Sequence, residues 1–293
     1  IIGAGPAGLE AAHALGKRGY KVILSEGRDE LGGRVTLESK LPTLKEWIRV
    51  KDYREQQFLK LSNVEVYLNS KINAEDALLA EVDHIVIATG AKWRNDGFGR
   101  SNLIGIHNLN ISNNIFTPDD IMSGKLPKGD VTIFDDDYYY MGPVIAEMLQ
   151  KIGCNVTFVT TSNMVCSFGN YTSEQLSTQK ALINAGIKLI FSKNIESYEQ
   201  RDIELACIYT NQRSKIKADS LVMITAKLPR DTLYYQLIDL IGSAKTKKIK
   251  TIRRIGDAEA PAPIASAVYS GRKYALEIDN NINLIHRDMK LDS

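Results

Sequence analysis

The sequence is poor in the residues that usually build metal sites and disulfide frameworks. It has four histidines and only three cysteines, Cys154, Cys166 and Cys207, which lie far apart and form no Cys-x-x-Cys pair. A zinc site, an iron–sulfur cluster or a disulfide scaffold needs several ligands at short spacing. The sequence therefore predicts ordinary thiols and no metal in this chain.

Strong net charge and long apolar runs are also lacking. The formal net charge is +2, and 44% of the residues are hydrophobic. No apolar run approaches the roughly 18 residues that a membrane helix requires. We therefore expect neither nucleic acid nor a membrane as a partner, and, without a signal segment, a cytoplasmic protein. The Lys-rich stretch 245–250 is typical of a solvated loop.

An initiator methionine is missing as well. The chain begins Ile1-Ile2 and reaches Gly3 at once, although a phosphate-binding turn follows a strand. We expect a fragment that starts inside or just before its first strand.

The strongest motif that is present is the glycine loop Gly3-Ala4-Gly5-Pro6-Ala7-Gly8. In such a loop Gly3 permits the tight turn, Gly5 lets a pyrophosphate approach the backbone, and Gly8 lets the next helix pack closely. The helix expected from Pro6 to Arg18 would offer its N-terminal N–H groups to the phosphates. Glycine spacing alone is weak evidence, but this loop stands between a strand end and a helix.

An acid stands at the expected distance after the loop. Glu26 follows a strand predicted over 20–25, about twenty residues beyond the glycines. There it is suited to accept hydrogen bonds from ribose hydroxyls. The sequence thus predicts an adenine nucleotide, either ADP or the ADP half of FAD.

Three further elements are candidates for the same site. Gly33, in Gly32-Gly33-Arg34, lets the chain pass close to the nucleotide, and Arg34 either contacts a phosphate or stays on the surface. Ala88-Thr89-Gly90 ends a strand at the same sheet edge, or is a plain turn. Gly256-Asp257 follows a last strand; Asp257 either meets a ribitol hydroxyl or the pyrophosphate, or simply caps a helix.

A second strand–helix–strand pattern begins near Val131 but lacks the glycines. Asp135-Asp136-Asp137 stand where its phosphate loop would be, followed by Tyr138 to Tyr140. Carboxylates repel a pyrophosphate and obstruct the backbone approach. The next strand ends in Thr160-Thr161-Ser162, without a ribose-binding acid or an Arg. This unit is therefore not expected to bind NAD(P)H in the ordinary way, and the tyrosines favour packing over redox chemistry.

The periodicity predicts two α/β units. Helices are expected over 51–61, 144–152, 173–185 and 263–277, strands over 64–68, 84–88, 131–134, 155–160 and 251–255, short strands across 187–224, and loops at 27–50 and 91–118. The closing segment returns to the first unit. The domains expected are 1–118 with 245–293, and an inserted 119–244 with a degenerate loop.

These stretches resemble the C-terminal half of the amine dehydrogenase flavoproteins, namely the trimethylamine, dimethylamine and histamine dehydrogenases, which are related to 2,4-dienoyl-CoA reductase and old-yellow-enzyme-like proteins. The likeness runs over nearly the whole chain. It rests on the glycine loop and on Glu46-Trp47, Asp52-Tyr53-Arg54-Glu55, Ala88 to Trp93 with Asp96-Gly97, Thr117-Pro118 and Gly256-Asp257-Ala258-Glu259-Ala260-Pro261. The acidic second loop makes the trimethylamine dehydrogenase type the nearest likeness.

The resemblance implies two Rossmann-like FAD/NAD(P)-binding domains of the glutathione-reductase type, the second inserted into the first. It also implies an N-terminal TIM barrel, outside this chain, that carries FMN and a [4Fe–4S] cluster and passes electrons to an electron-transferring flavoprotein. Three functions remain open: a portion that binds ADP structurally, an FAD-binding electron-transfer portion of a reductase, or a stand-alone nucleotide-binding module. No residue is a convincing catalytic acid, base or nucleophile.

Overall fold

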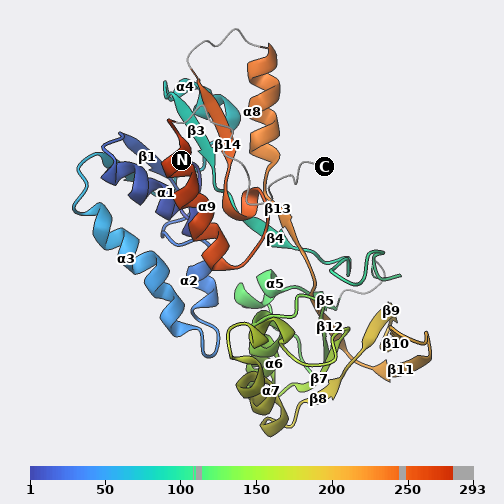
Figure 1. Cartoon of the computed structure of the whole chain (residues 1–293). Coiled ribbons are helices and arrows are strands. Elements are labelled where there is room, and N and C mark those ends of the chain that lie inside the picture. The colour runs from blue at the N-terminus through green and yellow to red at the C-terminus, as the bar shows by residue number, and fades with distance from the viewer. Residues whose placement is uncertain (108, 110–113, 244–248, 280–293) are drawn as a thin grey trace, which may run out of the picture. The chain divides into compact units, whose positions relative to one another are not determined.

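Contacts divide the chain into two compact units (Figure 1). The computed structural model describes residues 1–107, 109, 114–243 and 249–279. Unit 1 consists of Ile1–Gly33, Val50–Gly90 and Arg230–Ser293, and unit 2 of Arg34–Arg49 and Ala91–Pro229. The domain boundaries expected after 118 and 244 stay a prediction. Most of the Lys-rich stretch, 245–248, lies outside the described residues.

Unit 1 is an open parallel sheet with helices on both faces. Its elements are α1 (Pro6–Lys17), β1 (Val22–Ser25), α3 (Arg49–Phe58), β2 (Val64–Tyr67), α4 (Ala74–Leu79), β3 (His84–Ile87), α8 (Thr232–Ser243), β14 (Thr251–Arg254), η4 (Gly256–Ala258) and α9 (Ile264–Glu277). Strand β1 pairs with β2 and β3 pairs with β14, all parallel. Ile2 forms parallel bridges to Ser25 and Ile87, so it joins the two pairs at the middle of the sheet.

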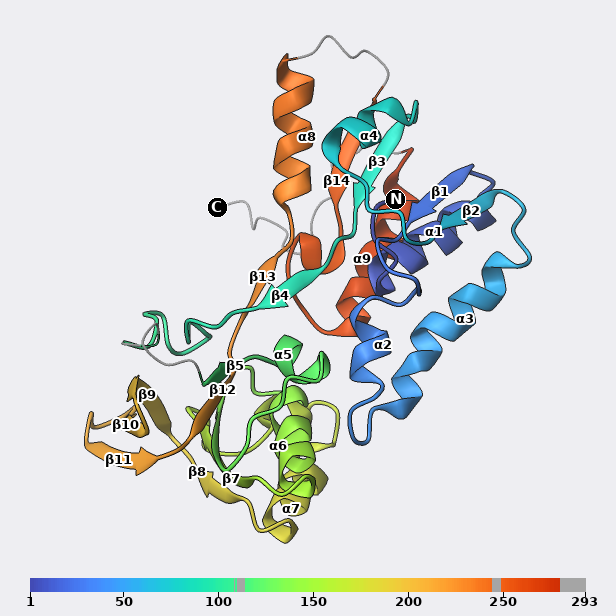
Figure 2. The same cartoon turned by 180° about the vertical axis from the view of Figure 1, so that it is seen from behind.

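Alternating side chains on β3 separate the two cores of unit 1. Val86 packs with α1 and α9, whereas Ile85 and Ile87 pack with α4 and α8. Strands buried on both faces are typical of parallel sheets covered by helices. Figure 2 shows β14 beside β3 from behind.

Helices α1 and α9 lie against each other at backbone distance (Figure 1). A Cβ added at Gly271 of α9 would lie 2.2 Å from the carbonyl oxygen of Ala7. Helix α1 is rich in alanine, and Leu9, Ala11 and Ala12 are fully buried. Small residues on both helices allow this close crossing, which fixes α9 beside the first turn of α1.

Unit 2 is built around a second parallel sheet. Its elements are α2 (Arg34–Glu38), η1 (Lys45–Ile48), β4 (Ala91–Trp93), β5 (Ile115–Phe116), α5 (Pro118–Met122), β6 (Asp130–Asp135), α6 (Met141–Lys151), β7 (Asn155–Thr160), η3 (Ser167–Asn170), α7 (Gln175–Asn184), β8 (Lys188–Ile190), β9 (Lys193–Glu199), β10 (Asp202–Cys207), β11 (Arg213–Lys217), β12 (Ser220–Ile224) and β13 (Lys227–Pro229). Strand order is β5-β12-β6-β7-β8, all parallel, with antiparallel β11-β10-β9 and β13-β4.

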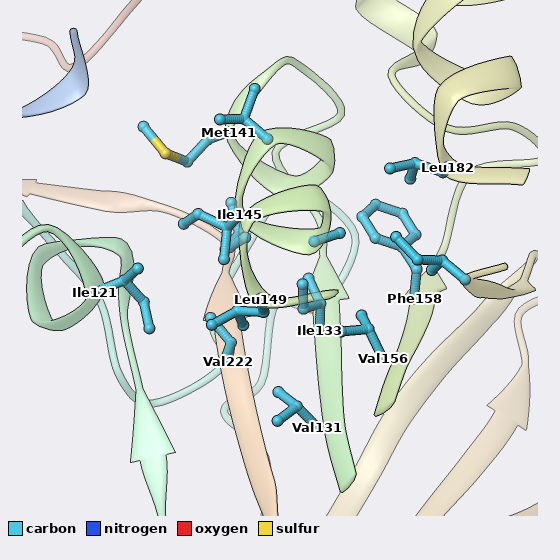
Figure 3. Close-up of a cluster of buried hydrophobic side chains, with 14 of the residues drawn as sticks. Ile121, Val131, Ile133, Met141, Ile145, Leu149, Val156, Phe158, Leu182 and Val222 are labelled. Atoms are coloured by element: carbon cyan, nitrogen blue, oxygen red, sulfur yellow. The ribbon is translucent and has the colours of Figure 1, made fainter. Parts of the chain in front are cut away.

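Both faces of this second sheet are covered. Figure 3 shows Ile133 and Val222 facing Ile145 and Leu149 of α6. The alternate residues, such as Phe134, pack instead with the antiparallel strands β9 and β10. The period of two along each strand therefore assigns one face to helices and the other to a sheet.

The expected elements are present, with shifted ends, but several others were missed. The region 27–50 contains α2 and η1 and is not a plain loop, and 91–118 contains β4 and β5. Helices α4, α5 and α8 were not predicted. The missed helices α2, α4 and α5 are five or six residues long, too short for an apolar period, and capping boxes at Asn73 and Thr117 begin α4 and α5.

We predict that Gly271→Ala destabilises unit 1. The new methyl would lie 2.2 Å from the Ala7 carbonyl oxygen, so α9 must move away from α1. Overpacking of this kind costs about 1–3 kcal/mol of unfolding free energy. Chemical denaturation measures it, with the exposed Ser266→Ala on the same helix as the control. Equal stability of the two variants would contradict the close crossing.

Candidate nucleotide-binding site

The glycine loop is held by backbone packing on its inner side. Gly3 has φ +101°, and a Cβ there would lie 2.5 Å from the carbonyl oxygen of Ala88. A Cβ at Gly8 would lie 2.0 Å from the carbonyl oxygen of Gly3. These two glycines therefore have the structural roles that the motif predicts, a tight turn and a close helix–sheet contact.

Gly5 differs from its neighbours because it faces open space. A Cβ at Gly5 would meet only the Cα of Gly33, at 3.9 Å. Gly5 is the N-cap of α1, with φ −74° and ψ −178°, a conformation open to any residue. Glycine is thus not required there by strain or packing, which leaves the approach of a ligand as its physical reason.

The Gly32-Gly33 pair passes directly over this loop. The N–H of Gly32 donates to the carbonyl oxygen of Ala4 at 2.8 Å. Gly33 has φ +58°, and a Cβ there would lie 2.7 Å from the Cα of Gly5. The sequence predicted a close approach to the nucleotide, and the structure places the pair against the loop expected to bind it.

The first turn of α1 presents free backbone donors. The first helical hydrogen bond runs from the N–H of Leu9 to the carbonyl oxygen of Gly5 at 2.9 Å. Pro6 has no N–H, and no side chain caps this end of the helix. The N–H groups of Ala7 and Gly8 therefore have no acceptor within the helix. Together with the positive end of the helix dipole they fit a phosphate.

Glu26 lies beside the loop and is 8% exposed. Its Oε2 accepts from the N–H of Ala4 at 2.9 Å, and its Oε1 accepts from the N–H of Arg28 at 3.0 Å. The Arg28 Nε lies 3.7 Å from the same Oε1. An ionised carboxylate has about four lone-pair sites, so acceptor capacity remains for ribose hydroxyls. Glu26 also fixes the glycine loop, a role that the motif does not reveal.

The Ala88-Thr89-Gly90 segment continues β3 at the same sheet edge. The N–H of Ala88 donates to the carbonyl oxygen of Ile2 at 2.8 Å. Thr89 Oγ1 donates to the carbonyl oxygen of Arg230. The backbone N–H of Arg230 in turn donates to the carbonyl oxygen of Gly90 at 2.8 Å. These bonds give the segment a structural role, and contact with a nucleotide stays a prediction.

Gly256 and Asp257 begin η4 after β14. A Cβ at Gly256, where φ is +59°, would lie 2.6 Å from the Cβ of Ala7. The N–H of Gly256 donates to Oγ of Ser270 at 2.9 Å, and Asp257 Oδ1 accepts from the N–H of Ala262 at 3.1 Å. Asp257 thus stabilises its own turn, and its bond to a cofactor stays a prediction. Ser270 was missed because no spacing rule links α9 to this turn.

Arg34 belongs to unit 2, and its side chain is engaged there. Its Nη1 forms an ion pair with Oδ1 of Asp119 at 2.8 Å, and its Nη2 donates to the carbonyl oxygen of Ala91 at 2.9 Å. Oε1 of Glu38 lies 3.8 Å from its Nε. Arg34 is therefore not simply a surface residue, and contact with a phosphate stays a prediction.

The acidic loop of unit 2 buries its first carboxylate. Asp135 ends β6 and is 1% exposed. Its carboxyl group packs against Gly142 of α6, where an added Cβ would lie 2.9 Å from Oδ1 of Asp135. Burial raises the pKa of Asp135 well above its usual value, and repulsion from Asp137 adds to this effect. The backbone N–H groups of Tyr138 and Asp137 offset the rise only in part. A buried acid here differs from the small residue that a dinucleotide loop uses.

The neighbouring tyrosines are packed together. The rings of Tyr139 and Tyr140 meet edge to face at 4.8 Å, and Trp47 meets Tyr140 at 4.4 Å. Tyr140 OH donates to Oε2 of Glu38 at 3.1 Å. These contacts are those of a structural aromatic cluster.

The three cysteines are unpaired in the described part of the chain. Cys154, Cys166 and Cys207 are free thiols, the first two buried. Within the residues that the structure describes, no group of three or more His, Cys, Asp or Glu side chains could hold a metal ion. Over the same residues, no helix is long and apolar enough to cross a membrane.

Two family models match the chain. Residues 1–128 match the family described as pyridine nucleotide-disulphide oxidoreductase, and residues 116–231 match the OYE-like second alpha/beta domain. The fold is therefore α/β with a pyridine nucleotide-disulphide oxidoreductase domain, a class that implies flavin binding.

Three of the similar proteins are named as amine dehydrogenases or an amine oxidase. The chain is 33% identical to dimethylamine dehydrogenase of Hyphomicrobium sp. (strain x), over 96% of this chain and 41% of that protein. Histamine dehydrogenase from Rhizobium sp. 4-9 superposes with a TM-score of 0.92 at 40% identity, over 97% of this chain and 44% of that one. The structure of 6-hydroxypseudooxynicotine amine oxidase from Pseudomonas geniculata N1 superposes with a TM-score of 0.91 at 38% identity, over 95% of this chain and 41% of that one.

This chain is thus homologous to the dimethylamine dehydrogenase and histamine dehydrogenase family of flavoprotein oxidoreductases. It spans less than half the length of these relatives.

We predict that Glu26→Ala weakens ADP binding. The substitution removes a charged acceptor for the ribose and the bond that holds the Ala4 N–H. Hydrogen bonds to charged groups contribute about 1.5–3 kcal/mol, so affinity should fall at least several-fold. Titration calorimetry on nucleotide-free protein measures it, and Glu26→Gln should retain part of the affinity. An unchanged dissociation constant in Glu26→Ala would exclude a ribose contact.

We predict that Asp135→Asn stabilises the chain near neutral pH. The folded pKa of Asp135 is raised, so above the unfolded pKa of roughly 4 the unfolded state loses its proton first and is favoured. The free energy of unfolding therefore falls as pH rises from the unfolded pKa toward the folded pKa of Asp135. Asparagine does not titrate, so Asp135→Asn removes this loss of stability. Denaturant midpoints at about pH 4 and about pH 7 measure the difference.

The exposed Asp202→Asn serves as the control for this change. A gain for Asp135→Asn that is the same at both pH values would contradict a raised pKa.

Proposed function

We propose that unit 1 binds an adenine nucleotide, ADP or the ADP half of FAD, at the glycine loop. The observation that carries the proposal is Gly5, which faces open space at the N-terminus of α1 while the other loop glycines are packed against backbone. The free N–H groups of Ala7 and Gly8 would hold the pyrophosphate. Glu26 would hold the ribose, 2.9 Å from the N–H of Ala4.

We infer that this nucleotide is structural ADP in an enzyme of the trimethylamine dehydrogenase type. The similarity to dimethylamine and histamine dehydrogenases supports this, as does the acidic loop of unit 2. The chain would be the C-terminal portion of a longer cytoplasmic enzyme. A TIM barrel with FMN and a [4Fe–4S] cluster would carry out amine oxidation, and an electron-transferring flavoprotein would accept the electrons.

The arrangement proposed is of the glutathione-reductase type, with a second dinucleotide-type domain inserted into the first. The composition of the two units supports this, because unit 1 draws on segments both before and after Ala91–Pro229. The match of residues 116–231 to an OYE-like second alpha/beta domain is in keeping with it.

An alternative is an FAD-binding electron-transfer portion of a reductase. The OYE-like match and the Gly256-Asp257 turn favour it, because Asp257 follows a strand at the edge where a ribitol would lie. A yellow protein with flavin absorbance would support this alternative against ADP. A stand-alone nucleotide-binding module is the third possibility.

We predict that Gly5→Val abolishes the ADP-induced thermal shift while the apo protein still folds. Valine can adopt the φ of −74° at Gly5, and its side chain would enter the space that the pyrophosphate needs. Ligand at a hundred times its dissociation constant adds about 2.7 kcal/mol of stability. The comparison is the ADP-induced shift in each variant, with Gly5→Ala as the smaller step. A full shift in Gly5→Val would place the nucleotide elsewhere.

A further inference from the structure

The carboxyl edge of the unit 2 sheet is where a nucleotide would bind in a doubly wound domain. Strand register aligns Ile224 of β12, Asp135 of β6 and Thr160 of β7 at this edge. The loop 136–140, which joins β6 to α6, begins there. Its residues contact a segment from much earlier in the chain, residues 97–102, which we call the strap.

Asp136 accepts hydrogen bonds from the strap and is completely buried. Its Oδ2 accepts from the backbone N–H of Ser101 at 2.8 Å and of Asn102 at 3.2 Å. Its Oδ1 accepts from Oγ1 of Thr161, just past the end of β7, at 2.9 Å. One carboxylate thus ties the strap to the loop after β6 and to the segment after β7.

Tyr138 makes a second connection at the cost of backbone strain. Its φ is +66°, which is unusual for a bulky residue. Its hydroxyl is hydrogen-bonded to Thr161 Oγ1 at 2.6 Å and to Oγ of Ser101. The strained conformation therefore places the hydroxyl between the strap and the residue after β7.

The fit of the strap against Asp136 depends on one glycine. A Cβ at Gly99 would lie 2.1 Å from Oδ2 of Asp136. The N–H of Gly99 donates to the carbonyl oxygen of Asn102 at 2.8 Å, and Nδ2 of Asn102 donates to Gly97 at 3.1 Å. The strap is therefore a closed turn, held internally and pressed against the carboxylate.

We propose that Asp136 is a specificity-determining residue that holds the strap across the carboxyl edge of the unit 2 sheet and so closes this edge to pyridine dinucleotides. The strap and the Asp136 carboxylate occupy the edge that the coenzyme phosphates would need. Pyridine dinucleotides are then excluded because the strap already fills the carboxyl edge of the sheet. This effect adds to the electrostatic repulsion expected from Asp135, Asp136 and Asp137. It is independent of the nucleotide proposed for unit 1.

Hydrogen exchange at the Ser101 and Asn102 amides tests this proposal. Asp136→Ala removes their charged acceptor, so their exchange should accelerate roughly tenfold or more. The amides of β6 and β7 report in the same spectra that the sheet is intact. Asp137→Asn is the matched control, because its only described contact with the strap is a 3.8 Å ion pair to Arg100; it should change these amides little.

Gly99→Ala supplies an independent variant without removing any hydrogen-bonding group. Its methyl would collide with Oδ2 of Asp136, so the same two amides should lose protection. In the Asp136→Ala background only the Cβ of residue 136, at 3.0 Å, remains near the new methyl, so adding Gly99→Ala should have a much smaller further effect than it has in the native chain. Such non-additivity would show that the contact between Gly99 and the Asp136 carboxylate holds the strap in place.

The proposal would be overturned by unchanged exchange of Ser101 and Asn102 in both Asp136→Ala and Gly99→Ala. Saturable NADPH binding to the native chain at submillimolar concentration, with these amides still protected, would overturn it equally. Absence of such binding to the native chain, together with the predicted non-additivity, is the supporting result.

Discussion

The structure of unit 1 depends on the close approach of backbone segments to the first turn of α1. Gly8 meets Gly3 on the sheet side, and Gly271 of α9 and Gly256 after β14 both meet Ala7. Each contact is too close for a methyl group. Segments from both ends of the chain therefore converge on one helical turn, because only glycine allows them to approach it.

The same constraint explains why the remaining glycine of the loop points to function. Packing determines Gly3 and Gly8 completely, whereas the space at Gly5 is open. Around that space lie free N–H groups of the first turn and a nearly buried carboxylate, Glu26, already aligned by backbone donors. If a nucleotide binds here, as we propose, the fold has already aligned the groups that would hold it, which would reduce the ordering cost of binding.

Unit 2 repeats the strand–helix–strand pattern but uses its sheet edge differently. Where unit 1 has glycines, unit 2 has Asp135 buried beside Gly142 and Asp136 bound to backbone N–H groups of another segment. A carboxylate at this position accepts donors from the protein and presents none to a phosphate. Two units of one architecture can therefore differ in ligand chemistry through the residues that follow a single strand.

Much of this was accessible from the sequence, since Gly3 to Gly8, Glu26 and the apolar strands follow local rules of spacing. Most of the longer helices and strands were predicted for the same reason, but the 12-residue helix α8 was missed. Short helices such as α4 and α5 were not, because their signal is a cap and not a period. Nor were Ser270 or the contact of Asp136 with Ser101, because tertiary packing, and no spacing rule, brings them to their partners. The Arg34–Asp119 pair was missed for that reason too.

The central claim is that the purified chain holds an adenine nucleotide in unit 1. Acid release of bound small molecules followed by mass spectrometry tests it most directly, with absorbance spectra to detect flavin. We predict ADP at about one equivalent per chain, because the described residues contain one complete glycine loop, Gly3 to Gly8. Release of FAD instead would favour the reductase alternative. Release of no adenine nucleotide, together with no saturable binding of added ADP, would contradict the account.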